Sequence, residues 1–88
     1  MTVDIEGSYR LSKNVSLRPE RFGALAYSFD TRKLSFLKHP DLVRVLETLA
    51  DHETIRETFV AAQIDPARWP SFLKALSTLE QSEMINAV

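Results

Sequence analysis

Two neighbouring segments, residues 24–29 and 33–37, alternate between large apolar side chains and small or polar ones. This period of two is typical of a strand with one buried face, because successive side chains of a strand point to opposite sides. In the first segment Leu25, Tyr27 and Phe29 share one face. In the second segment Leu34 and Phe36 do the same. Because the apolar sides of both strands coincide in one register, an antiparallel hairpin is favoured.

The apolar faces of the two strands predict a register for this hairpin. If Phe29 pairs with Leu34, then Tyr27 lies opposite Phe36, and one register buries all of the large side chains together. Asp30 suits the first position of a type I turn, but the connection has no Asn-Gly pair. The type of turn therefore stays open.

A further strand is expected before the hairpin, at residues 15–18, where Val15 and Leu17 flank Ser16. Pro19 has no N–H to donate, so we expect it to end this strand. Residues 19–22 would then turn the chain into the hairpin. The result is a three-stranded antiparallel meander in chain order, with the third strand at an edge.

The chain after residue 39 has the signals of helices. Pro40 suits a first helical position, and Asp41 complements the positive end of the helix dipole. Apolar residues then recur at helical spacing at Leu42, Val45, Leu46 and Leu49. Thr54 and Glu57 have the spacing of a capping box, which predicts the start of a second helix.

A third helix is expected after Asp65 and Pro66, although Pro70 allows a start up to four residues later. Its apolar face contains Phe72, Leu73, Leu76 and Leu79, and the chain then reaches Met84 and Ile85, which are expected to close over the core. The predicted fold class is α+β: a three-stranded antiparallel sheet followed by three helices, in a winged-helix-like arrangement.

The chain of 88 residues is long enough for one compact domain. Residues 1–8 lack periodicity, so we expect a flexible N-terminal tail followed by a single domain over residues 9–88. The sequence has no cysteine, no signal-peptide pattern and no apolar run approaching the roughly 20 residues of a membrane span. These features favour a cytoplasmic protein with no membrane partner.

No cluster of residues indicates catalysis or metal binding. His39 and His52 are 13 residues apart, and no second histidine or cysteine lies at ligand spacing from either. The two glycines, Gly7 and Gly23, do not form a phosphate-binding loop. We therefore expect a binding protein that is not an enzyme and has no metal or cofactor.

Charge is distributed unevenly along the chain. Residues 1–44 contain eight Lys or Arg and five acidic residues, whereas residues 45–88 contain three and seven. The strand half is thus suited to an acidic partner. A winged-helix DNA-binding regulator is the alternative function, but the predicted third helix offers only Arg68 and Lys74 among several acids, too few for phosphate neutralisation. We expect no nucleic-acid partner.

The segments Tyr9-Arg10-Leu11-Ser12, Val15-Ser16-Leu17-Arg18-Pro19-Glu20, Phe22-Gly23-Ala24-Leu25-Ala26-Tyr27 and Arg32-Lys33-Leu34-Ser35-Phe36-Leu37 carry a resemblance to a known family. The chain resembles the mycofactocin biosynthesis chaperones, which belong to the wider PqqD-like group of peptide-recognition elements. The resemblance covers about residues 9–85 and is most specific over residues 17–37. Relatives often have a Gly before the final apolar pair, where this chain has Glu83.

The resemblance implies that the leader of a ribosomally made precursor peptide adds as a strand to the third strand, in the groove beside the third helix. The chaperone would then deliver this peptide to a radical S-adenosylmethionine maturase. The implied partners are the precursor leader and the maturase. A free edge strand suits both a monomer and a dimer, so both oligomeric states stay open.

The expected peptide-binding residues belong to two elements. The third strand provides its edge backbone, so that Ser35→Pro is expected to remove one edge donor; Arg32 and Lys33 are expected to meet acidic leader side chains. The strand residues of the predicted site are Arg32, Lys33, Leu34, Ser35, Phe36 and Leu37. The third helix is expected to line the groove with Trp69, Leu73 and Leu76.

Overall fold

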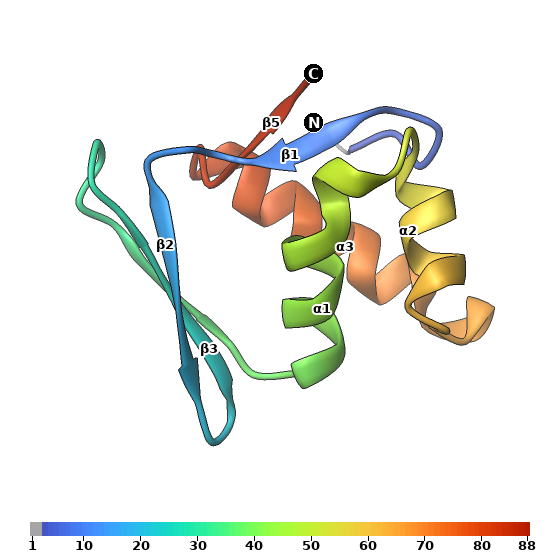
Figure 1. Ribbon diagram of the computed structural model, residues 1–88, viewed down its shortest axis with the longest axis horizontal. Coiled ribbons are helices and arrows are strands. Elements are labelled where there is room, and N and C mark those ends of the chain that lie inside the picture. The colour runs from blue at the N-terminus through green and yellow to red at the C-terminus, as the bar shows by residue number, and fades with distance from the viewer. Residues whose placement is uncertain (1–2) are drawn as a thin grey trace.

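The computed structural model describes residues 3–88 and contains two small sheets packed beside three helices (Figure 1). In chain order the elements are β1 (Tyr9–Leu11), β2 (Val15–Glu20), β3 (Gly23–Ser28), β4 (Leu34–Leu37), α1 (Pro40–Thr48), the 3₁₀ turn η1 (Leu49–Asp51), α2 (Ile55–Ala61), the 3₁₀ turn η2 (Pro66–Arg68), α3 (Trp69–Gln81) and β5 (Ile85–Ala87). The predicted α+β class, with a three-stranded sheet and three helices, is confirmed.

The larger sheet has the strand order β2-β3-β4, so the predicted antiparallel meander is confirmed. A second sheet, in which β1 pairs with β5, was not predicted. Each of these strands has only three residues, too few to show a period of two. Met84 and Ile85 are buried at the start of this pairing and close over the core, as expected.

The register of the hairpin differs by two residues from the predicted one. Tyr27 lies opposite Leu34, and Leu25 lies opposite Phe36. The backbone N–H of Ser28 donates to the carbonyl of Lys33 at 3.0 Å, which leaves residues 29–32 as the connecting loop. Phe29 therefore lies in the loop, and the prediction that it pairs with Leu34 is wrong. A shift of two residues keeps each side chain on its original face.

The two faces of the sheet are reversed relative to the prediction. Ala24, Ala26 and Ser28 are 1%, 1% and 2% exposed, whereas Phe29 and Phe36 are 63% and 64% exposed. The expectation that the large side chains of the hairpin fill the core is therefore wrong. Small side chains on the inner face allow β3 to approach α1 closely, and the helices provide the large core residues instead.

The helices begin where the sequence predicts. α1 starts at Pro40, and the hydroxyl of Thr54 accepts the N–H of Glu57 at 3.1 Å to cap α2. The carboxylate of Glu57 accepts the N–H of Glu53, one residue before the donor expected in a capping box. Asp65 caps η2 by accepting the N–H of Ala67, and α3 then begins at Trp69.

Pro19 lies within β2 opposite Ala24 instead of ending the strand. β2 is an edge strand, and the N–H of Phe29 donates to the carbonyl of Asn14. Alternation along an antiparallel ladder then directs the backbone groups of Asn14 and every second residue after it toward β3. The nitrogen of Pro19 faces the open side, where its missing hydrogen has no consequence.

The described part of the expected N-terminal tail contacts the helices. Val3 is buried, and its N–H donates to the hydroxyl of Ser77 on α3 at 2.9 Å. The carbonyl of Ile5 accepts the N–H of Arg56 at 3.0 Å, at the start of α2. Residues 1 and 2 of the expected tail lie outside the described residues. Within residues 3–88, no helix has the length and apolar character needed to cross a membrane.

Gly23 allows β3 and β4 to come together at the point where the hairpin meets α1. Its φ is +143°, and a Cβ at this position would lie 2.0 Å from the carbonyl oxygen of Leu37. We expect Gly23→Ala to lower the free energy of unfolding by about 1–3 kcal/mol because the clash is with backbone and the φ is strained. Urea denaturation measures this loss. Ser16→Ala on exposed β2 is the control, and equal midpoints for both variants would contradict the prediction.

Candidate functional site

The free edge of β4 presents backbone groups that pair with no other strand among residues 3–88. Because Lys33 bonds to Ser28 of β3, alternation directs the N–H and C=O groups of Ser35 and Leu37 toward β3 as well. The N–H and C=O groups of Leu34 and Phe36 face the open side. The expectation that Ser35→Pro removes an edge donor is therefore wrong, because Ser35 donates within the sheet.

A cleft runs between this edge and α3. Its volume is about 260 Å³. Residues from β4, α1 and α3 line it: Ser35, Phe36, Leu37, Leu42, Ala75, Thr78 and Leu79. A second hollow of about 380 Å³ shares Leu42 and Ala75 with the first and is completed by His39, Arg68, Ser71 and Phe72. The two hollows form one groove along α3, with Leu42 of α1 at its floor.

One face of α3 forms the wall of the groove. Ser71, Ala75 and Thr78 recur at a spacing of four and three residues, which places small side chains in a row on the helix surface. Small side chains leave room between the helix and β4. In the sequence these small residues lie next to the apolar positions Phe72, Leu76 and Leu79, and their regular spacing could have predicted a groove on this side of α3.

The three helix residues that were expected to line the groove lie elsewhere. Leu76 is fully buried in the core. The ring of Trp69 packs on Phe59 at 5.6 Å between centroids, and its Nε1–H donates to the carbonyl of Ile64 at 3.0 Å. Leu73 is half-buried against the core. The groove wall is thus displaced around α3, because the apolar stripe is broad enough to contact both the core and the groove.

The strand residues of the expected site are brought together at the edge of the sheet. Leu34 and Phe36 direct their side chains to the outer face, and Leu37 is buried at the inner face. Arg32 and Lys33 are exposed at the loop that precedes β4. Arg32 has a φ of 59°, and its N–H donates to the carbonyl of Ser28, so the loop fixes the backbone at this cation.

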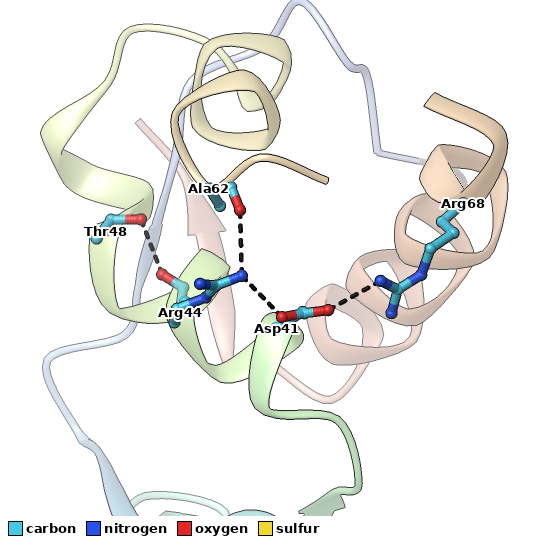
Figure 2. A network of polar contacts seen from close by, with 5 residues as sticks. All are labelled: Asp41, Arg44, Thr48, Ala62 and Arg68. Carbon is cyan, nitrogen blue, oxygen red and sulfur yellow. Dashed lines mark hydrogen bonds and ion pairs between the residues drawn. The ribbon is translucent and has the colours of Figure 1, made fainter. Parts of the chain in front are cut away.

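A polar network joins α1, which provides the floor of the groove, to the start of α3, which provides its wall (Figure 2). The carboxylate of Asp41 accepts from Arg44 at 2.7 Å and from Arg68 at 2.8 Å. Arg44 also donates to the carbonyl of Ala62, where α2 ends. The network therefore joins the start of α1 to the end of α2 and the start of α3. It also leaves the guanidinium of Arg68 4.9 Å from the ring centroid of Phe72, at one end of the groove.

The hydrogen bond from Arg68 holds the pKa of Asp41 below its usual value, and the charge of Arg44 acts in the same direction. Among residues 3–88 no group of three His, Asp or Glu side chains is placed to hold a metal ion. The groove thus offers backbone hydrogen-bonding groups and apolar walls, with Arg68, paired with Asp41, at one end. Backbone groups at a free strand edge beside apolar walls suit an extended peptide, and the groove contains no catalytic constellation.

A family model described as the peptide chaperone MftB family matches residues 8–86. The chain belongs to this family. It is 46% identical to the peptide chaperone MftB of Mycolicibacterium smegmatis over 85 residues, which are 97% of this chain and 83% of the relative. The chaperones of the same name from Mycobacterium ulcerans and Mycobacterium tuberculosis are each 45% identical over 93% of this chain and 75% of the relative. No solved structure matches the chain.

Membership of the MftB family agrees with the expectation that the protein binds a peptide and is not an enzyme, because the relatives are named for a chaperone role. The alternative of a DNA-binding regulator has no support from the relatives. The structure adds a physical argument against it. The exposed cations of α3 and the turn before it are Lys74 and Arg68, and Arg68 is paired with Asp41, so this region offers little charge to a phosphate backbone.

Asp41→Asn is expected to destabilise this chaperone at neutral pH by about 0.5–1 kcal/mol, since two exposed ion pairs are lost. The folded pKa of Asp41 is depressed, so the unfolded chain takes up the proton first as pH falls. The stabilisation that ionised Asp41 provides is therefore complete above the usual Asp pKa of about 3.9, and it is lost as pH falls through the folded pKa. Urea denaturation across this range measures it. Glu47→Gln on the same helix is the control, and a wild-type advantage that persists in acid would contradict the assignment.

Proposed function

We propose that the protein binds the leader of a ribosomally made precursor peptide as an added strand on β4 and delivers it to a radical S-adenosylmethionine maturase in mycofactocin biosynthesis. The observation that carries the proposal is the free edge of β4 beside a groove walled by α3. Family membership supports a peptide partner. The maturase and the pathway follow from the resemblance of residues 17–37 to the chaperones of that pathway.

The backbone contribution to binding is modest. Leu34 and Phe36 offer two N–H and two C=O groups at the edge, and each hydrogen bond contributes about 0.5–1.5 kcal/mol net. Four bonds thus give about 2–6 kcal/mol, from which the cost of ordering an extended peptide is subtracted. The edge alone does not produce tight binding. Side chains of the leader must supply the remainder, and they also supply specificity.

The groove defines which leader side chains fit. Alternate residues of an added strand point to opposite faces, so one set enters the groove and the other set continues the outer face of the sheet. Leu37, Leu42 and Leu79 line the groove and favour apolar side chains in the first set. Lys33 precedes β4, so an acidic leader residue is favoured at that end, whereas Arg68 at the other end is already paired with Asp41.

Phe36→Pro tests strand addition at this edge, with Phe36→Ala as the matched variant. Both remove the ring, but only proline removes the outward N–H, and an edge position of this kind tolerates proline. We expect the proline variant to bind a synthetic leader about two- to tenfold more weakly than the alanine variant in calorimetric titration. Equal affinities for two folded variants would exclude pairing at Phe36.

A graded charge series tests the electrostatic part. Replacing both Arg32 and Lys33 by Gln, and then both by Glu, is expected to weaken leader binding stepwise and to flatten its dependence on salt. The measurement is the dissociation constant at several ionic strengths. If the Glu variant binds as the wild type does at low salt, the leader makes no charge contacts with this loop.

A further inference from the structure

The outer face of the larger sheet is an exposed patch of apolar side chains. Phe22, Phe29, Leu34 and Phe36 are 41%, 63%, 54% and 64% exposed, and they account for most of the large exposed hydrophobic residues. Two aromatic pairs organise the patch. Phe22 packs on Phe36 at 6.0 Å between ring centroids, and Tyr27 packs edge to face with Phe29 at 5.3 Å.

This patch, which we call the outer face, adjoins the groove along α3 at Phe36, but its other residues do not line the groove. The register places Leu25, Tyr27, Leu34 and Phe36 on the side of the sheet opposite to Ala24, Ala26 and Leu37, which pack inward. In Figure 1 the helices lie to one side of the sheet, and its other side has no element over it. A contiguous apolar patch of this kind is typical of an interaction surface, because exposed aromatic side chains forgo the stabilisation that burial would give.

The charges around the outer face indicate what covers it. Residues 15–38 contain five Lys or Arg and two acidic residues. Arg18 lies on the outer face opposite Leu25, with its side chain 77% exposed, and pairs with Glu20 at 3.4 Å. The net positive charge of this region therefore comes from its other Lys and Arg residues. A second copy in a two-fold dimer would bring the same cationic patch against itself. An apolar surface bordered by carboxylates is the complementary partner.

We propose that the outer face is the docking surface for the maturase, through an apolar patch on that enzyme bordered by acidic residues. This inference rests on the proposed function, which assigns a maturase as recipient of the peptide. It also gives the delivery step a geometry. The maturase binds one face of β4 while the leader occupies the edge and groove of the same strand, so neither partner displaces the other.

A leader bound at the edge enlarges the docking surface. Every second side chain of the added strand continues the outer face beyond Leu34 and Phe36. The maturase therefore contacts the chaperone and its peptide together, which favours docking of the loaded chaperone over the empty one. We call the outer face together with the added strand the joint surface. Because the maturase recognises both parts, loading of the peptide promotes delivery without a change in the chaperone's conformation.

The test uses Phe29→Ser, with Val60→Ser as the control. Both side chains are 63% exposed, so neither substitution costs much folding energy, but Val60 lies on α2 away from the sheet. Affinity for the purified full-length maturase is measured with and without a synthetic leader. Affinity for the leader alone is measured separately, and sedimentation reports the mass of each variant.

We expect Phe29→Ser to weaken maturase binding about tenfold or more, with leader affinity unchanged within about twofold and Val60→Ser equal to wild type. We also expect the leader to strengthen docking of the wild type. Unchanged maturase binding in Phe29→Ser, or a dimer that this substitution dissociates, would overturn the inference while leader binding stands. Equal docking with and without leader would overturn the joint surface. Absence of leader binding in the wild type would instead refute the proposed function.

Discussion

The structure depends on the close approach of β3 to the helices. Ala24, Ala26 and Ser28 form an inner face with almost no side-chain volume, and the sheet contacts α1 across them. Large residues at these positions would push the sheet away from the helices and widen the groove between β4 and α3. The same constraint leaves the larger side chains of the hairpin on the outer side. The groove and the exposed patch therefore have one physical origin.

β4 performs three tasks with four residues. Leu37 anchors the strand in the core, the backbone of Leu34 and Phe36 faces the open edge, and the side chains of the same two residues face outward. Gly23 makes this arrangement possible because its missing Cβ leaves space for the carbonyl of Leu37. At the other side of the groove, Asp41 ties the start of α1 to the start of α3. Gly23 and Leu37 thus position the strand, and Asp41 helps to position the helix.

The sequence predicts most of the fold because its signals are local. Pro40, Thr54 and Asp65 mark helix starts through hydrogen bonds and steric limits that act within a few residues. The orientation of the hairpin was not predictable in the same way. A period of two shows that a strand has two different faces, but hydrophobicity alone assigned the face with Tyr27 and Phe29 to the core. Packing against α1 requires small side chains, so the face with Ala24, Ala26 and Ser28 is buried instead.

In the candidate site, too, local features were predictable from the sequence and features set by tertiary packing were not. The edge strand was predictable, because the order of a meander follows from chain order and short turns. The groove wall was not, since Leu76 and Ala75 are neighbours in sequence and only the rotation of α3 about its axis determines which one faces β4. The prediction for Trp69 was wrong because the sequence does not show that its indole N–H donates to the backbone carbonyl of Ile64, which does not belong to the groove.

The central claim is that a leader peptide pairs with the outward backbone of β4. Amide hydrogen exchange resolved at single residues tests it most directly, with the leader absent and at saturation. The account predicts that the amides of Leu34 and Phe36 become protected when the leader binds, whereas those of Ser35 and Leu37 are already protected by β3. Binding that leaves the exchange of Leu34 and Phe36 unchanged, or protects β2 instead, would contradict the account.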